Sequence, residues 1–465
     1  MKKKYNLRKE GIAKLKGDAK YIDDFKLIDG LHGATVRSPE PRGILRKIHF
    51  SPKIDWSEFV IITAKDIPGK NYITMIEMDW PVLVSEKINH KGEAIALIAH
   101  PCKLEVKRAL KFISFEIDPL PPVFTIKDSH EKKNIIWRDN NLFKEYTIKK
   151  GEPEAIWDDP SLTIISQSYS TGAQEQLYIE NNGMIGEYSE AEGVTIRGSL
   201  QCPYYVHSAL CPIFNLPDEK VRIIQAETGG GFGGKEEFPS LVAAHAALLA
   251  MKAKKPVKLV YDRAEDMANS TKRHPSESMH KMAVDKNGKI KAWEIDFYLD
   301  GGAYFTLSSV VLSRGCIHAP GPYYCENTRV NAKAFATNTF PHGAFRGFGA
   351  PQSIFATERF MDYVAKNIDI DPIEFRLKNI IKKGQTTATG QTIKENIDYK
   401  KLINSLLEKS DFHKKTKRYE SENKNSHLKK AFGIATFMHG AGFTGSGEAY
   451  LASVVGVRGT PKGKV

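Results

Sequence analysis

The strongest chemical signal in the chain is a glycine-rich loop at 229–236, with the sequence GGGFGGKE. Glycines adopt backbone conformations closed to other residues and let main-chain N–H groups approach a ligand, so the loop is a candidate oxyanion or phosphate cradle. The segment also fits the start of a P-loop, but Glu236 stands where a Ser or Thr would hold magnesium. A carboxylate there would repel phosphates, which argues against nucleotide hydrolysis. A purely structural glycine turn is the plain alternative.

A second glycine-rich loop occupies 343–352, with the sequence GAFRGFGAPQ. Its glycines leave Arg346 and Phe348 free to reach into a cavity, where they would supply a charged fork and an aromatic wall. Taken singly, each side chain is more often a packing residue. Together with the first loop, they predict a site.

Hydrophobic periodicity indicates the elements that must position these loops. A β-type run at 221–226 precedes the first loop, and an apolar stretch at 240–251 after it predicts a buried helix. The second loop leads into a surface helix at 352–364, where Pro351 can begin the first turn. Further strands are predicted from apolar runs at 60–63, 94–99 and 162–168, and from the alternation of Trp293, Ile295, Phe297 and Leu299.

Turn signals divide the chain. Asp285-Lys286-Asn287-Gly288 is typical of a hairpin that would pair the strand at 282–284 with the alternating one. Three prolines within 119–122 mark a first boundary, and the polar segment 379–395 is a predicted linker.

Composition excludes several classes of protein. The 465 residues are 41% hydrophobic, which predicts several domains. There is neither a long apolar run nor a signal peptide, so we expect a cytoplasmic protein without a membrane span. The net charge of +13 is spread among acidic neighbours, which favours a solvated basic surface over nucleic-acid binding. Five scattered cysteines encode no disulfide framework and no iron–sulfur cluster: Cys102, Cys202, Cys211, Cys316 and Cys325.

Four segments resemble, in order, the large molybdenum subunit of the xanthine dehydrogenase and aldehyde oxidase family. They are GDAKYIDD at 17–24, VRSP at 36–39, GGGFGGKE at 229–236 and AFRGFGAPQ at 344–352. The resemblance implies an α+β fold with an α/β hammerhead domain followed by molybdopterin-binding domains of mixed sheets and helices. The implied domains are the hammerhead at 1–125, the first molybdopterin-binding domain at 126–380, and an incomplete start of the second at 396–465.

The same resemblance assigns roles to individual residues. Gln201 matches the glutamine that hydrogen-bonds the apical oxo ligand of molybdenum, and Phe232, Gly233 and Arg346 match further groups around the metal and pterin. Glu236, Arg314 and Phe348 match positions that face the substrate. Molybdenum is held by the cofactor's dithiolene in this family, so no protein cysteine ligand is expected.

The chain departs from the family pattern near its end. The glutamate that acts as general base in the family is expected beyond residue 465. Glu448, in GSGE at 445–448, resembles the motif that carries this base but comes too early, so we interpret it as a decoy. These features predict a fragment or one half of a split subunit, inactive and poorly stable alone, with unpaired strands in its incomplete last domain.

The resemblance implies oxidative hydroxylation of an electron-poor carbon, with water as the oxygen source. The pairing of Glu236 with Arg314 favours a purine such as xanthine or hypoxanthine, and the alternatives are an aldehyde, nicotinate or another N-heterocycle. A further alternative is a truncated, non-catalytic chain or binding module. Because the chain has neither cluster cysteines nor a flavin fingerprint, FAD-binding and 2Fe-2S subunits are implied as partners. The expected cofactor is molybdenum-molybdopterin, with or without a cytosine dinucleotide.

Overall fold

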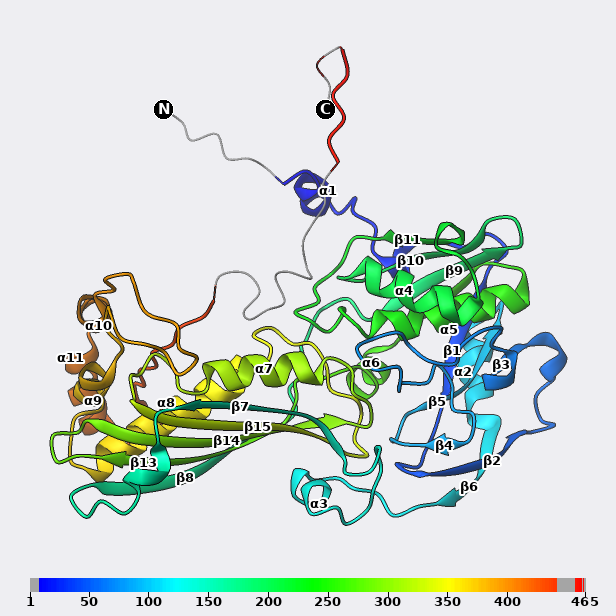
Figure 1. Ribbon diagram of the computed structural model, residues 1–465. Coiled ribbons are helices and arrows are strands. Elements are labelled where there is room, and N and C mark those ends of the chain that lie inside the picture. Colours follow the sequence, from blue (N-terminus) through cyan, green and yellow to red (C-terminus); the bar gives the residue numbers. More distant parts are fainter. Residues whose placement is uncertain (1–7, 441–455, 462, 464–465) are drawn as a thin grey trace.

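The computed structural model of the protein describes residues 8–440, 456–461 and 463 (Figure 1). The helices that position the candidate site are α4 (Pro203–Phe214), α5 (Pro239–Ala253), α7 (Ser308–His318) and α8 (Ala350–Asn367), whereas α2 (Lys103–Ala109) and α6 (Arg263–Ala268) line a separate cavity. Shorter or peripheral helices are α1 (Gly11–Lys16), α3 (Ile126–His130), α9 (Pro372–Asn379), α10 (Tyr399–Lys409) and α11 (Phe412–Glu422).

A seven-stranded mixed sheet forms one end of the molecule. Its strand order is β11-β10-β9-β12-β1-β5-β3. The strands are β1 (Leu31–Arg37), β3 (Val60–Thr63), β5 (Ala94–His100), β9 (Gly183–Ser189), β10 (Gly193–Gly198), β11 (Val221–Gln225) and β12 (Val257–Val260). Strands from before and after position 125 therefore hydrogen-bond in one sheet, through the parallel pair of β1 with β12.

Helix α5 lies against this sheet beside α4 (Figure 1). Its residues from Pro239 to Ala250 are all buried, because apolar side chains occur on every side of the helix. Gly186 of β9 lets the helix backbone approach, since a Cβ there would lie 2.6 Å from the carbonyl carbon of Ala246. The predicted buried helix is confirmed.

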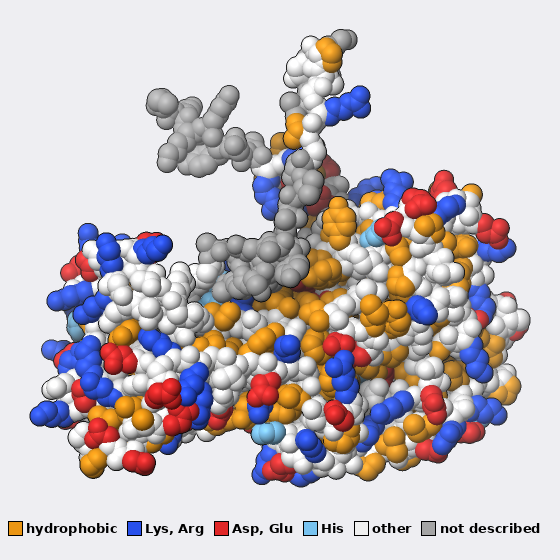
Figure 2. Space-filling model, viewed as in Figure 1, with side chains coloured by type: hydrophobic (Ala, Val, Ile, Leu, Met, Phe, Trp, Pro, Cys, Tyr) orange, Lys and Arg blue, Asp and Glu red, His pale blue; other side chains and the backbone are white. Residues whose placement is uncertain are grey.

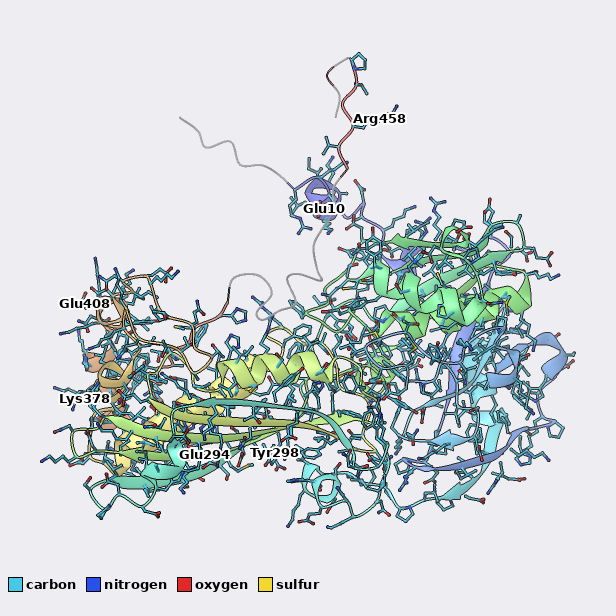
Figure 3. The ribbon with its side chains drawn as sticks, in the orientation of Figure 1. Glu10, Glu294, Tyr298, Lys378, Glu408 and Arg458 are labelled. Atoms are coloured by element: carbon cyan, nitrogen blue, oxygen red, sulfur yellow. The ribbon has the colours of Figure 1, made fainter. Side chains whose placement is uncertain are left out.

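A five-stranded sheet forms the other end, in the order β7-β15-β14-β13-β8. Its strands are β7 (Leu142–Lys150), β8 (Thr163–Thr171), β13 (Ser276–Val284), β14 (Ile290–Gly302) and β15 (Asn327–Ala336). The predicted hairpin joins β13 to β14, with Gly288 at φ 74°. The alternating side chains of β14 divide as predicted: Trp293 and Phe297 are fully buried, while Glu294 and Tyr298, labelled in Figure 3, are only half-buried.

Helices α7 and α8 pack with this sheet. Helix α8 is longer than the predicted 352–364 and buries one face, including Phe360, Met361 and Val364. A third sheet, β4-β2-β6, completes the N-terminal region, with β2 (Gly43–Phe50), β4 (Lys87–Ile88) and β6 (Ile113–Pro119).

The C-terminal region differs from the expectation of unpaired strands. Within 396–440 the structure describes the helices α10 and α11 and an extended tail, and no strand. The tail contacts helix α8, because the backbone N–H of Thr436 donates to Glu358 Oε2 at 2.8 Å. Glu448 lies outside the described residues.

Surface charge is mixed on the visible face of the molecule. Figure 2 shows Lys and Arg side chains interspersed with Asp and Glu, and hydrophobic side chains gathering toward α4 and α5. Among the described residues, no helix is long and apolar enough to cross a membrane.

Candidate functional site

The two glycine-rich loops, more than a hundred positions apart in sequence, meet in space. The backbone N–H of Arg346 donates to the carbonyl of Phe232 at 2.9 Å. Gly233 has φ 100°, and a Cβ at this position would lie 2.7 Å from the carbonyl oxygen of Ala344. This close approach requires glycine, because any side chain would push the loops apart.

Two buried side chains hold Ala344 between the loops. Gln176 donates from Nε2 to the carbonyl of Ala344 at 2.9 Å, and Glu237 Oε1 accepts from the Ala344 N–H at 3.0 Å. Burial raises the pKa of Glu237 to about 7. Gln176 Oε1 and Glu237 Oε2 are buried without a hydrogen-bond partner among the described residues.

Gln201 lies at the mouth of the first loop, directly before α4. Its Oε1 accepts from the N–H groups of Gly233 at 3.0 Å and Lys235 at 3.3 Å, and its own N–H donates to the Lys235 carbonyl at 2.7 Å. The residue is exposed, so its position is fixed by the loop and not by burial.

Lys235 and Glu236, although adjacent, have separate environments. Lys235 is fully buried and donates to Glu180 Oε2 at 3.1 Å and to Ser199 Oγ at 2.8 Å. The same Glu180 oxygen accepts from the N–H of Gly229 at 2.7 Å, which anchors the start of the loop. Lys235 is therefore paired with Glu180 and not with its neighbour Glu236.

Glu236 is half-buried, and burial, reinforced by the charge of Glu237, raises its pKa to about 8. Its electrostatic neighbours also include Cys202 and Tyr205 at the start of α4. A carboxyl with this pKa is largely protonated at neutral pH, so it can donate a hydrogen bond to a ligand.

Arg314 and Phe348 lie close to each other. The guanidinium carbon of Arg314, on α7, lies 5.8 Å from the centre of the Phe348 ring. Gly349, at φ 93°, lets the second loop pass α7, since a Cβ there would lie 2.1 Å from the carbonyl oxygen of Val311. The side chain of Arg346 is exposed. The loops thus bring Gln201, Phe232, Gly233 and Arg346 together, while Arg314 joins them through Phe348.

Three supporting residues were not identified from sequence: Gln176, Glu237 and Arg273. Arg273 is buried, with Nη2 donating to the carbonyl of Arg346 at 3.1 Å and the guanidinium 3.8 Å from the Phe345 ring. Its segment carries no motif, and its role depends on contacts with residues distant in sequence. Of these three residues, only Glu237 had a signal in the sequence that could have identified it, because it directly follows the glycine-rich loop at 229–236.

The first loop also presents donors to a ligand. Within the described part of the chain, the N–H groups of Gly230, Gly231 and Phe232 have no protein acceptor. Such donors fit the polar edge or phosphate of a pterin cofactor. The nearby Cys202 belongs to no cluster of three or more metal-ligating side chains among the described residues. The residues present therefore fit a cofactor that carries its own metal ligands.

A cavity of about 1040 Å³ lies elsewhere, between α2, β1, β12 and α6. Its wall includes Glu180 but none of the site residues predicted from sequence. We therefore define the candidate site by the two loops and not by this cavity.

Two parts of the chain match models of known protein families. Residues 16–121 match the aldehyde oxidase and xanthine dehydrogenase a/b hammerhead domain, and residues 135–380 match the molybdopterin cofactor-binding domain. The nicotinate dehydrogenase large molybdopterin subunit of Eubacterium barkeri is 33% identical over 88% of this chain and 96% of its own length. A probable xanthine dehydrogenase subunit of Bacillus subtilis is 32% identical over 94% of this chain but only 58% of its own length.

Solved structures share the fold of this chain. The aldehyde oxidoreductase of Desulfovibrio gigas superposes with a TM-score of 0.80 at 26% identity, over 89% of this chain and 47% of the other. Quinoline 2-oxidoreductase of Pseudomonas putida has a TM-score of 0.81 at 23% identity, over 90% of this chain and 55% of the other, and supports the fold alone. The chain thus spans about half the length of these solved relatives.

Proposed function

Because the chain belongs to the molybdopterin-binding family of xanthine dehydrogenases and aldehyde oxidases, we propose that it is a subunit of a molybdenum hydroxylase that acts on an N-heteroaromatic ring. The observation that carries the proposal is the meeting of the two glycine-rich loops, with Gln201, Phe232, Gly233 and Arg346 around one point.

The cofactor, when bound at these loops, supplies the two-electron oxidation that inserts oxygen from water into an electron-poor carbon. The chain's own contribution is to hold the cofactor and to orient the substrate. Gln201 offers its side-chain amide at the mouth of the first loop, and the free N–H groups at the tip of that loop bind polar atoms of the pterin. Arg346 adds positive charge at the exposed edge of the second loop.

We name Glu236, Arg314 and Phe348 the substrate wall, and the chemistry of these three side chains favours a flat, polar heterocycle. Phe348 offers a ring for stacking, the protonated carboxyl of Glu236 donates a hydrogen bond, and Arg314 stabilises negative charge that develops on the ring. Purines such as xanthine and hypoxanthine present ring nitrogens and carbonyl oxygens to both groups. A plain aldehyde lacks the ring nitrogens and the several carbonyl oxygens that would engage Glu236 and Arg314 together.

Nicotinate is the second candidate. The relative that this chain matches over 96% of its length is named as part of a nicotinate dehydrogenase. A pyridine carboxylate suits the same wall, because its carboxylate can pair with Arg314 while its ring nitrogen accepts a hydrogen bond from Glu236.

Partners complete the proposal. The general base is a glutamate supplied from outside the described residues, either by a further part of the chain or by a second molybdopterin-binding subunit. FAD-binding and 2Fe-2S subunits carry electrons away, and the complex is cytoplasmic. The pterin carries, in one form of the proposal, a cytosine dinucleotide. The isolated 465-residue chain is expected to lack turnover.

Co-expression with candidate partner subunits tests the proposal. The purified complex should contain molybdenum and oxidise xanthine, hypoxanthine or nicotinate faster than an aldehyde, with the new oxygen labelled from isotopic water. A complex that contains molybdenum but oxidises only aldehydes would contradict the substrate assignment. A correctly assembled complex without molybdenum would contradict the function itself.

A further inference from the structure

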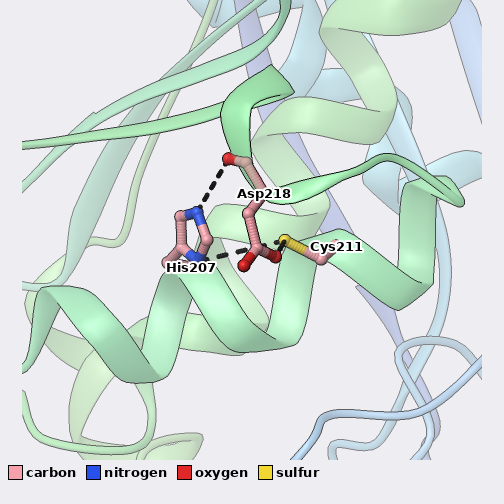
Figure 4. Close-up of side chains that lie close together, drawn as sticks. All are labelled: His207, Cys211 and Asp218. Carbon is pink, nitrogen blue, oxygen red and sulfur yellow. Dashed lines mark hydrogen bonds between the residues drawn. The ribbon is translucent and has the colours of Figure 1, made fainter.

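Three metal-ligating side chains converge beside α4. His207 and Cys211 lie one turn apart on α4, and Asp218 begins the short 3-10 helix η6 (Asp218–Lys220) (Figure 4). The Cys211 Sγ lies 3.9 Å from His207 Nδ1 and 3.6 Å from Asp218 Oδ1. Together, the three ligand atoms lie within 4.8 Å of one another.

The backbone fixes which histidine nitrogen faces the cluster. His207 Nε2 lies 3.0 Å from the carbonyl oxygen of Asp218. A carbonyl can only accept, so Nε2 carries the proton and Nδ1 presents its lone pair toward Cys211. Metal-bound histidines in proteins are oriented in this way, through a bond from the second ring nitrogen to a backbone carbonyl or carboxylate.

We propose that His207, Cys211 and Asp218 form a zinc site with three protein ligands and one position open to water. Zinc binds nitrogen at about 2.0–2.1 Å and thiolate sulfur at about 2.3 Å in tetrahedral geometry, so its ligand atoms lie about 3.5 Å apart. The observed separations of Sγ from Nδ1 and Oδ1 are close to this value. A thiolate and a carboxylate together neutralise the charge of Zn²⁺.

The site would clamp two segments that lead to the candidate functional site. Helix α4 starts two residues after Gln201, and η6 continues into β11, which leads to the glycine loop at 229–236. The C-terminal end of α4 also supports the N-terminal region, because the N–H of Gly69 donates to the carbonyl of Ile213 at 2.9 Å. A bound ion would therefore stiffen the connection between Gln201 and this loop without contacting either.

The alternative is a metal-free hydrogen-bonded triad. Burial and the bond to Asp218 raise the pKa of Cys211 to about 11, so without metal the thiol is protonated and donates to Asp218. Zinc must displace this proton, because the thiolate is the ligand. The two states are distinguished by whether a metal binds through sulfur.

Titration of the untagged, metal-free full chain with Co²⁺ tests the proposal, because a cobalt–thiolate bond gives a charge-transfer absorption band. We expect one equivalent of Co²⁺ to produce this band, and one equivalent of Zn²⁺ to abolish it by displacement. Cys211→Ser should remove the band and weaken Zn²⁺ binding by at least roughly 100-fold, since a direct ligand should matter more than an outer partner. Cys102→Ser is the matched control, because Cys102 is exposed and far along the chain, and it should change nothing.

Asp218→Asn is a second ligand variant, which keeps the test valid if Cys211→Ser does not fold, because Asp218 is exposed and lies outside α4. It should weaken Zn²⁺ binding by roughly 10-fold or more while leaving the circular dichroism spectrum unchanged. Zinc should raise the melting temperature of the unmodified chain by a few degrees and leave that of Cys211→Ser unchanged. Absence of the band in the unmodified chain, or an equal band in Cys211→Ser, would overturn the proposal.

Discussion

Two adjacent carboxyl groups, Glu236 and Glu237, have different tasks in the candidate site. Glu236 is half-buried and faces the substrate in our proposal, whereas Glu237 is fully buried and accepts from the N–H of Ala344. Burial raises both pKa values, to about 8 and about 7, and the charge of Glu237 contributes to the shift of Glu236. Protonation of Glu237 is thus linked to the contact between the loops.

The pKa of Glu237 makes stability depend on pH. The unfolded chain ionises this carboxyl near its ordinary pKa of 4.5, while the folded chain keeps it protonated up to about 7. Its contribution to stability is therefore complete below pH 4.5 and is lost as pH rises to about 7. Between about pH 5 and pH 8 the unmodified chain should lose about 2–3 kcal/mol more unfolding free energy than Glu237→Gln, measured by urea denaturation. Glu219→Gln, an exposed change, should leave the pH profile as it is, and parallel profiles for Glu237→Gln and the unmodified chain would refute the assignment.

Arg314 should separate N-heterocycles from aldehydes. In the reconstituted complex, Arg314→Met should lower turnover of purines or nicotinate by roughly 10²-fold, because one charge contact to the transition state is lost. Aldehydes should be affected less, and molybdenum content should stay unchanged. Steady-state kinetics on both substrate classes measure this difference. Equal losses on both classes would show that Arg314 supports the fold and does not face the substrate.

Among the elements, the glycine loops act through close backbone approach. Gly233 combines a left-handed backbone with a close contact to Ala344, whereas Gly384 has φ 86° and would place a Cβ in open space, with no atom within 4 Å. Substitutions at Gly233 and Gly384 can therefore be compared to separate the cost of a left-handed backbone from the cost of steric contact.

Gly233→Ala should therefore be more costly than Gly384→Ala. Both should lose about 1–2 kcal/mol from the left-handed backbone, and Gly233→Ala should lose about 1–3 kcal/mol more from the contact with Ala344. Midpoints of chemical denaturation measure the loss of stability in each variant. Pterin content of the co-expressed complex measures whether the loop still binds cofactor, and it should fall only for Gly233→Ala. Indistinguishable results for the two variants would show that the loop contact has no role in cofactor binding.

At the scale of the whole molecule, apolar residues near the first loop remain exposed in this chain. Phe232, Leu177, Ile179 and Tyr204 expose 49%, 66%, 90% and 84% of their surface. Clustered exposure of this kind is typical of surfaces that bind other proteins. It supports the proposal that a second molybdopterin-binding unit covers the loops.

Metal analysis of the assembled complex should place iron outside this chain. The cysteines lack cluster spacing, and the structure leaves all five free, with Cys316 and Cys325 buried. We expect molybdenum in the complex, and iron and flavin to remain with the other subunits when this chain is separated from them. Elemental analysis and flavin absorption measure the partition. Stoichiometric iron on the separated chain would contradict this expectation.

The resemblance of the motifs, in their order, to a known family predicted the family and the α+β fold, whereas patterns in the sequence itself predicted the buried helix at 240–251 and the hairpin at 285–288. The helix and the hairpin are local features, since they depend on hydrophobic periodicity and on the backbone preferences of glycine and asparagine. The domain limits and the roles of the site residues remain proposals.

Tertiary structure alone decided which groups meet. Lys235 binds Glu180 and not its neighbour Glu236, Gln176 and Glu237 both hydrogen-bond Ala344, and the carbonyl of Asp218 accepts from His207. Each of these contacts joins segments whose proximity depends on strand order and helix packing. Side-chain pairing across such distances is set by how the apolar faces of the sheets and helices bury one another, and no local pattern in the sequence encodes it.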